Sequence, residues 1–195
     1  MAKKHQLKDS EYHLSKQDLR KLIHAAESFR DRCILKTLAM TAVRRFELAK
    51  LDIRDIDFER RRFYIREGKG GKERTIPVSE DLLGDLRHLL GRRKQGPVFA
   101  SARGGGKLSV RQINQLVAKA GNKAGVENLN PKYKNITCHL FRHTFAREWK
   151  RQSGSIETLS KILGHTSVKT TLDEYGTEDL TEVQENYERV IEEMF

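Results

Sequence analysis

Residues 138–145 read Cys138-His139-Leu140-Phe141-Arg142-His143-Thr144-Phe145, and Leu163-Gly164-His165 follows, ten residues before Tyr175. His139 and Arg142 are three residues apart, so on a helix they share one face. An arginine binds phosphate through two parallel hydrogen bonds, and a histidine can donate to the same oxygens. A tyrosine offers a phenol for attack on phosphorus. This stretch therefore predicts a helical site that holds a phosphate group and attacks it.

The composition limits the classes of protein to which the chain can belong. The chain has 195 residues, of which 38 are basic and 27 acidic, for a net charge of +11. One domain is the default at this length, and the basic excess indicates a polyanionic partner, nucleic acid first. The alternative is a solvated surface that happens to be basic. No apolar run is long enough to cross a membrane and no secretory signal is visible, so we expect a cytoplasmic protein.

The hydrophobic periodicity predicts an α+β fold that is mainly α, with a small three-stranded antiparallel sheet. β-prone segments between Ile53 and Val78 are broken by residues 59–61 and by the glycine-rich residues 68–72, which read as two tight turns. Cys33 and Cys138 lie in apolar helical patterns and are expected to be buried free thiols. Helices are expected at about 15–26, 31–42, 46–51, 79–90, 109–124, 138–152, 155–163 and 166–173, with an amphipathic tail helix over 181–195.

Short motifs follow one another along the chain from about Leu14 to Tyr175. Residues 41–48, Thr41-Ala42-Val43-Arg44-Arg45-Phe46-Glu47-Leu48, resemble the first arginine box of the tyrosine recombinases, the phage-integrase and Xer-like family. Residues 68–74, Gly68-Lys69-Gly70-Gly71-Lys72-Glu73-Arg74, resemble the β-hairpin that carries that family's catalytic lysine. The His139–Arg142 box, the Leu163–His165 box and Tyr175 complete the family's order. The resemblance implies the DNA breaking-rejoining fold of the family's catalytic domain.

The resemblance also implies roles for single residues. Two arginines would clamp the phosphate, two histidines would donate to its oxygens or help to take the phenol's proton, and a lysine would protonate the leaving 5′ oxygen. Tyr175 would form a covalent 3′-phosphotyrosyl link, which keeps the bond energy without ATP or metal. The catalytic set implied is Arg44, Lys69, His139, Arg142, His165 and Tyr175, with Glu47 and His143 in supporting positions around it.

Several alternatives remain at this point. Lys72 competes with Lys69 for the catalytic position, and Tyr12, Tyr64, Tyr133 and Tyr187 are other tyrosines, although none follows a Leu-Gly-His box. The spacing of His139 and His143 could suggest zinc, but the glutamate of a His-Glu-x-x-His site is absent. The glycine runs do not fit a nucleotide-binding loop. We therefore expect no metal and no cofactor.

Basic and polar side chains near these motifs are candidates for contacts with double-stranded DNA. Cations on the sheet turn, the loop before residue 110 and the helix after residue 138 would track phosphates, which position a protein without specifying sequence. A polar helix face after Ser109 could read base edges or could simply be solvated. The DNA-binding candidates are Lys72, Arg74, Arg103, Lys107, Arg111, Gln112 and Arg147.

The expected organisation is a loose N-terminal arm over 1–13, a catalytic domain over 14–180 and the tail over 181–195. The N-terminal core-binding domain of the family is expected to be absent, as in a fragment or a minimal enzyme. Partners would be DNA and further copies of the chain: a monomer in free solution and a homotetramer on DNA, with possible exchange of tails, and no membrane. Integration, excision and multimer resolution fit equally. Rival functions are a relaxing topoisomerase of the IB type and a DNA-binding module that does not cut.

Overall fold

The computed structural model describes residues 12–66, 73–101, 104–152, 154–176, 188 and 191–192. Most helices begin where a Ser or Thr hydroxyl accepts a hydrogen bond from a backbone N–H of the first turn, which satisfies a donor that the helix leaves unpaired. The capped helices are α1 (Lys16–His24), α2 (Phe29–Thr41), α4 (Glu80–Leu90), α5 (Val110–Ala124), α6 (Cys138–Arg151), α7 (Ile156–Leu163) and α8 (Val168–Tyr175). The expected mainly helical fold is confirmed, and α8 continues to Tyr175, two residues beyond the predicted end.

The sheet has three short antiparallel strands in the order β1 (Ile56–Asp57), β2 (Arg62–Ile65) and β3 (Arg74–Pro77). Phe63 on the central strand pairs with Ile56 on one side and Ile76 on the other, and all three side chains are buried. Period-2 alternation therefore sets which face of the sheet meets the core. The predicted sheet is confirmed.

One predicted strand segment is wrong. Ile53 belongs to a 3₁₀ turn, η2 (Ile53–Asp55), because the Asp52 carboxylate accepts from the Arg54 N–H and the Asp55 carboxylate accepts from the Asp52 N–H. Local side-chain bonds to the backbone compete with strand pairing, and here they prevail.

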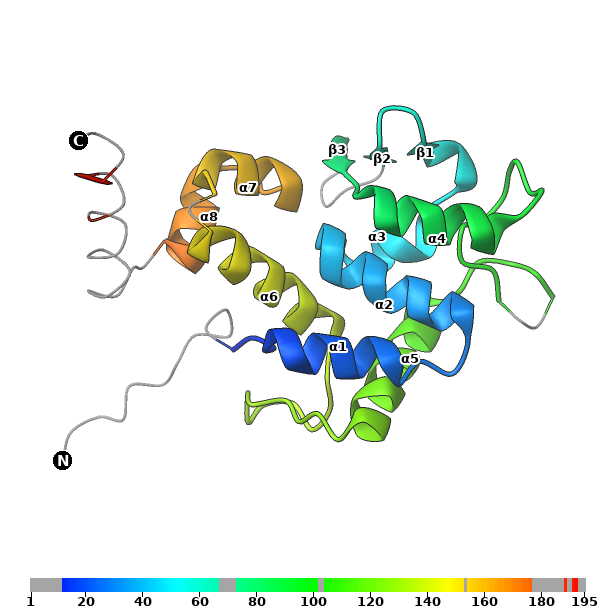
Figure 1. Cartoon of the computed structure of the whole chain (residues 1–195), viewed down its shortest axis with the longest axis horizontal. Helices are drawn as coiled ribbons and strands as arrows, with labels where there is room; N and C mark the ends of the chain where they lie inside the picture. Colours follow the sequence, from blue (N-terminus) through cyan, green and yellow to red (C-terminus); the bar gives the residue numbers. More distant parts are fainter. Residues whose placement is uncertain are drawn as a thin grey trace.

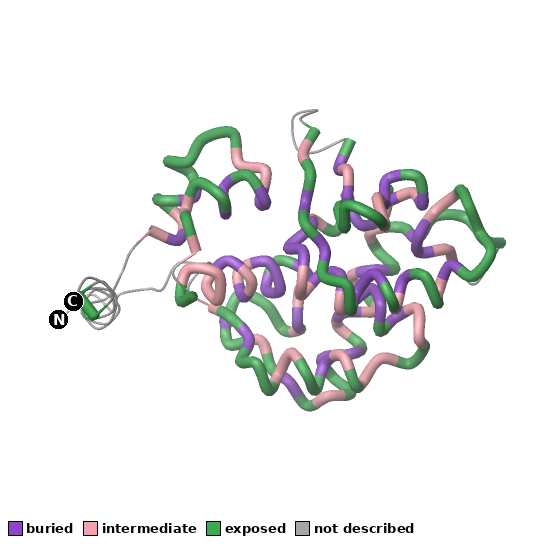
Figure 2. Tube along the Cα trace, turned by 45° about the horizontal axis from the view of Figure 1, so that its top comes forward, coloured by how far each residue is buried: buried purple, intermediate pink, exposed green. Residues whose placement is uncertain are grey.

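The main core is built where α2 lies against α4 and α6 (Figure 1). Leu35, Leu38 and Phe141 are fully buried there, and Figure 2 shows the buried positions gathered toward the inside of the main body, with exposed positions around its rim. Cys33 and Cys138 are buried free thiols, as predicted. No helix in the described part of the chain is long and apolar enough to span a membrane.

A second, smaller apolar cluster adjoins the main core, and the half-buried Phe145 and Trp149 pack against both. We call it the satellite cluster, and it joins α7 and α8 to α6 and to the end of α2. Its buried members are Ala42, Ala146, Leu159, Leu163 and Tyr175. The candidate nucleophile is thus also a packing residue.

Candidate active site

Arg44 and Glu47 are brought together by the short helix α3 (Arg45–Lys50). Arg44 precedes its first turn, and the Glu47 carboxylate reaches back to accept from the Arg44 N–H at 2.7 Å, as in a capping box. Arg44 Nη1 also lies 3.2 Å from Glu47 Oε1, and the Glu47 side chain is fully buried. The hydrogen bond from the Arg44 N–H to Glu47 therefore fixes the backbone position from which the Arg44 side chain extends.

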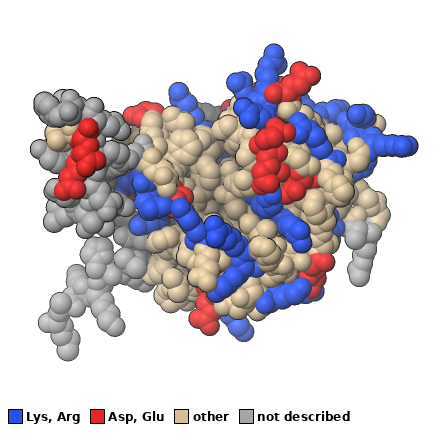
Figure 3. Space-filling model, viewed as in Figure 1, with Lys and Arg blue, Asp and Glu red and all other residues tan. Residues whose placement is uncertain are grey.

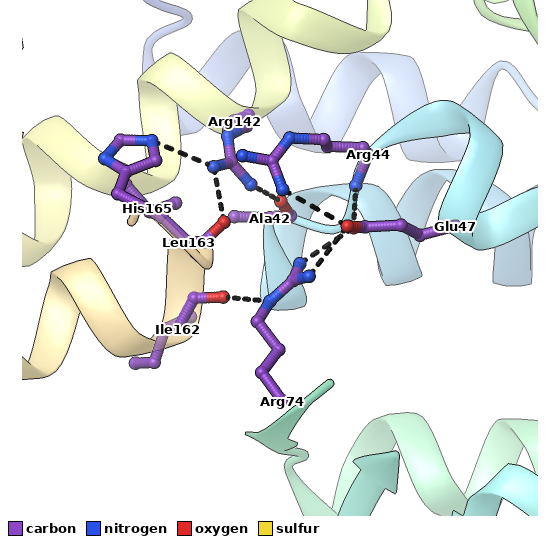
Figure 4. A network of polar contacts seen from close by, with 8 residues as sticks. All are labelled: Ala42, Arg44, Glu47, Arg74, Arg142, Ile162, Leu163 and His165. Carbon is purple, nitrogen blue, oxygen red and sulfur yellow. Dashed lines mark hydrogen bonds and ion pairs between the residues drawn. The ribbon is translucent and has the colours of Figure 1, made fainter. Parts of the chain in front are cut away.

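Arg74 of β3 supplies the main counter-charge for Glu47 (Figure 4). Its Nη1 and Nη2 each donate to one Glu47 oxygen at 2.7 Å, and its Nε donates to the Ile162 carbonyl at 2.8 Å. Burial alone would raise the pKa of Glu47, but the hydrogen bonds and charge of Arg74, with Arg44, hold this pKa below its usual value. The Arg74 side chain is only 8% exposed. Three N–H groups of Arg74 therefore donate inside the protein, and its predicted contact with a DNA phosphate stays a prediction.

The turn between α7 and α8 needs a glycine at position 164 for two reasons. Gly164 has φ +66°, a left-handed conformation that glycine adopts without strain. A Cβ at this position would lie 2.7 Å from the Arg74 side chain. The Leu-Gly-His motif thus reflects packing against Arg74 as well as the end of a helix.

Arg142 lies at the centre of the site and is 5% exposed. Nη1 donates to the Ala42 carbonyl at 2.8 Å, and Nη2 donates to the Leu163 carbonyl at 2.7 Å and lies 3.2 Å from His165 Nε2. Its guanidinium lies beside that of Arg44 in Figure 4. Burial, followed by repulsion from Arg44, lowers the pKa of Arg142 to about 10. Arg142 therefore remains charged at neutral pH, and an anion that binds between the two guanidinium groups would relieve their repulsion.

Ala42 accepts from Arg142 in an unusual backbone conformation. It ends α2 with φ +52° and ψ +24°, a left-handed geometry that usually belongs to glycine. Its side chain is fully buried in the satellite cluster. Packing and the hydrogen bond from Arg142 thus hold a strained residue inside the first arginine box, two positions before Arg44.

His165 is oriented from both sides of its ring. Nδ1 lies 2.8 Å from the hydroxyl of Thr171 on α8, and Nε2 faces Arg142. The structure therefore brings Arg44, Arg142 and His165 into one place from three separate parts of the chain, as the motif order implied. Their predicted catalytic roles stay predictions.

Tyr175 lies within hydrogen-bond distance of His143. The Tyr175 hydroxyl lies 2.8 Å from His143 Nδ1, and the tyrosine is 5% exposed. Burial, followed by the charge of Glu174, raises the pKa of Tyr175, and the nearby charge of Arg142 opposes this only in part. The phenol is neutral at neutral pH, so attack needs a base, and His143 lies where that base should be.

His139 shares its helix with these groups but lies at the solvent-facing side. Its ring centroid is 6.3 Å from that of His143. Partial desolvation and the guanidinium groups of Arg45, Arg142 and Arg44 lower its pKa, so it is neutral at neutral pH. A neutral imidazole can donate one hydrogen bond to a phosphate oxygen.

The remaining candidates divide into three groups. Lys69, Lys72 and Arg103 lie outside the described residues. Gln112 is exposed, but its side-chain oxygen accepts from the Ser109 N–H and hydroxyl, so it caps α5. Lys107 and Arg111 are exposed and Arg147 is half-buried.

Sequence reasoning missed Glu174, although its position directly before the candidate nucleophile was a visible signal.

We expect Arg74→Met to destabilise the domain by about 3–5 kcal/mol, because the substitution leaves the buried Glu47 carboxylate with too few partners. Chemical denaturation at pH 7 measures the change. The loss should shrink as the pH falls below about 4.3, since a carboxylate with a lowered pKa stabilises only while it is ionised.

The control for this prediction is Arg54→Met. Arg54 also pairs with a carboxylate, that of Asp52 at 3.0 Å, but its side chain is 70% exposed. An exposed pair contributes at most about 1 kcal/mol. Equal losses in the two variants would contradict the structural role of Arg74.

Comparison with known proteins agrees with this geometry. The model of the phage integrase family matches residues 13–181. The tyrosine recombinase XerA of Pyrococcus horikoshii is 35% identical over 162 residues, which cover 81% of this chain and 54% of the relative. The tyrosine recombinase XerC of Corynebacterium glutamicum is 33% identical over 150 residues, or 74% and 46% of the two chains. The chain spans about half the length of these curated relatives.

Solved structures show the same fold. The crystal structure of XerA recombinase superposes with a TM-score of 0.75 at 31% identity, over 91% of this chain and 64% of that one. The Tn1549 transposon integrase, solved in complex with circular intermediate DNA, gives 0.72 at 18% identity over 91% and 66%. A family model that matches nearly the whole domain and the convergence of both arginine boxes with His165 and Tyr175 lead to one conclusion: the chain belongs to the phage integrase family, as a tyrosine recombinase catalytic domain.

Proposed function

We propose that this domain cleaves and rejoins DNA strands by site-specific recombination, with Tyr175 as the nucleophile. The observation that carries the proposal is the convergence of four groups from distant parts of the chain. Arg142 donates hydrogen bonds to the Leu163 carbonyl and to His165, and Arg44 lies beside Arg142. The charges of both arginines partly oppose the rise in the pKa of Tyr175, so the phenol lies close to them. Permanent cations held around one point are what a phosphoryl transition state needs.

In this proposal the scissile phosphate lies between Arg44 and Arg142. Attack by the phenol oxygen of Tyr175 builds negative charge on the non-bridging oxygens, and the two guanidinium groups neutralise it. His165 presents Nε2 beside Arg142 Nη2, and because a guanidinium only donates, Nε2 accepts in this contact. When Arg142 turns its N–H groups to the phosphate, a protonated Nε2 can donate a further bond to it. These groups are preorganised by the bonds to Glu47, Ala42, Leu163 and Thr171 described above, so little reorganisation is needed during the reaction.

Two protons must move for the exchange to balance. His143 Nδ1 takes the proton of the Tyr175 hydroxyl as the bond from oxygen to phosphorus forms. The bond to the 5′ oxygen breaks, and that oxygen needs a proton, for which the sequence offers Lys69 outside the described residues. The product is a 3′-phosphotyrosyl link and a free 5′ hydroxyl. Attack by a 5′ hydroxyl of another strand reverses both transfers and rejoins the DNA.

Double-stranded DNA is the proposed partner. Lys and Arg side chains form a band across the face where α1 and α6 lie (Figure 3), and Arg147 of α6 lines a depression with Tyr175. Lys107 and Arg111 remain candidates for phosphate contacts elsewhere on the surface. Solved relatives include recombinases bound to DNA. A homotetramer on DNA with exchange of tails is a further proposal, and its tail lies mostly outside the described residues.

The test is to trap the intermediate on nicked suicide duplexes, in which the short fragment that carries the released 5′ hydroxyl is lost and the strand cannot be rejoined. DNA flanking the gene supplies the sequences. A band that survives denaturation, with a mass-spectrometric adduct on the peptide that contains Tyr175, would support the proposal. Supercoil relaxation without recombinants would favour a topoisomerase, and tight binding without any adduct would favour a module that does not cut.

A further inference from the structure

One acidic side chain lies among the reacting groups of this cationic site. Glu174 directly precedes Tyr175 on α8 and is 35% exposed. One carboxylate oxygen lies 3.8 Å from His143 Nδ1, and the other lies 3.9 Å from His165 Nε2. A single carboxylate therefore spans the two histidines that approach the site from different elements.

The two nitrogens that face Glu174 are the ones that the proposed chemistry uses. His143 Nδ1 is bonded to the Tyr175 hydroxyl, and His165 Nε2 is next to Arg142 Nη2. Both distances to Glu174 exceed those of direct hydrogen bonds, so the carboxylate acts on these nitrogens mainly through its charge. In the proposed function, a bound phosphodiester would bring a second negative charge to the same two histidine nitrogens.

We propose that Glu174 is the resident anion of the active site, which faces the two histidines while no DNA is bound and which the scissile phosphate must displace. The inference rests on the proposed function, because it assigns to Glu174 a role in slowing the proposed cleavage. Two negative charges cannot share the same histidines without strong repulsion in a partly desolvated site. A phosphate that is held correctly by both arginines can displace the carboxylate, whereas a loosely placed one cannot.

The surroundings of Glu174 give it room to move. Its side chain lines a depression of about 260 Å³ together with His139 and His143, and it also borders the one that contains Tyr175 and Arg147. Displacement into solvent therefore needs rotation of a surface side chain and no unpacking of the core. Glu174 also contributes, after burial, to the raised pKa of Tyr175. Its departure would thus ease the loss of the phenol proton.

The test compares Glu174→Gln with Asp173→Asn on a suicide duplex at saturating DNA. Glutamine keeps the size of the side chain and removes the charge. We expect the rate of adduct formation to rise about tenfold in Glu174→Gln, an effect of the order of a like charge at about 4 Å. Asp173→Asn removes the same charge from an exposed neighbour on α8 and should change the rate less than twofold. Tyr175→Phe in the Glu174→Gln background should give no adduct.

A second measurement does not depend on cleavage. Inorganic phosphate is titrated into each variant, and the ring signals of His143 and His165 are followed by NMR. Phosphate should bind Glu174→Gln about tenfold more tightly than wild type, and Asp173→Asn should match wild type. Slower cleavage in Glu174→Gln, equal rates in the two variants, or unchanged phosphate affinity would each overturn the proposal. If neither wild type nor any variant forms an adduct but phosphate affinity rises in Glu174→Gln, the proposed function is contradicted, while the role of Glu174 as the resident anion is supported.

Discussion

We expect Tyr175→Phe to abolish the covalent protein–DNA adduct and to leave DNA affinity within about threefold of wild type. The phenol oxygen is the atom that would bond to phosphorus, and phenylalanine removes only that atom. The ring keeps its place in the satellite cluster, so the fold loses little more than the bond to His143, about 1 kcal/mol. The melting temperature should fall by no more than about 4 °C. Suicide duplexes with denaturing gels measure the adduct, and fluorescence anisotropy measures binding.

The matched control is Tyr64→Phe. The Tyr64 hydroxyl also donates to a side chain, the carboxylate of Asp57 at 3.2 Å, so this variant loses a similar bond far from the site. Its adduct yield should equal that of wild type. An adduct of normal yield in Tyr175→Phe would rule out this nucleophile.

Arg142→Lys should lower the single-turnover cleavage rate by about 10²–10³-fold, with a smaller effect on DNA affinity. Lysine keeps the charge, but one ammonium group cannot reproduce the planar fork that bonds Ala42, Leu163 and His165 together. Arg142→Ala would be a poorer test, because both carbonyls would lose their donor and the fold itself would weaken. Rates are measured at saturating DNA, well below the melting temperature of each variant.

Arg32→Lys makes the same exchange at an exposed position of α2 and should leave cleavage unchanged. Near-normal cleavage in Arg142→Lys would exclude a specific need for the guanidinium. A drop equal to the loss in DNA affinity would place Arg142 in binding alone.

The sequence predicted those parts of the structure that depend on neighbouring residues. Ser15 and Ser109 stop a polar segment and start a helix because their hydroxyls cap the next turn, and this can be read from spacing alone. Phe63 and Ile65 alternate with polar residues, which fixes the buried face of β2. The motif order, by resemblance, predicted which arginines, histidines and tyrosine belong to one site.

The parts that could not be predicted depend on contacts between distant residues. Arg74 reads as a surface cation on a basic strand, and only its pairing with Glu47, 27 residues earlier, turns it inward. The choice of His143 over His139 as the partner of Tyr175 depends on how α8 packs against α6, which spacing along one helix does not reveal. The position of Glu174 could not be predicted either, because its carboxylate faces His143 on α6 and His165 in the turn between α7 and α8.

The division of the apolar core into two clusters has a consequence for stability. Among the described residues, α7 reaches the main core through Ile162, whereas Tyr175 is the buried apolar side chain that α8 contributes. Small packed units can open with a free energy below that of global unfolding, so they act as cooperative units of their own. A local opening that frees α8 would therefore unpack few apolar side chains, while α7 stays attached to the main core through Ile162. Such an opening would move Tyr175 away from His143, and the hydrogen bonds that Arg74 and Arg142 donate to the carbonyls of Ile162 and Leu163 would still hold the end of α7 in place.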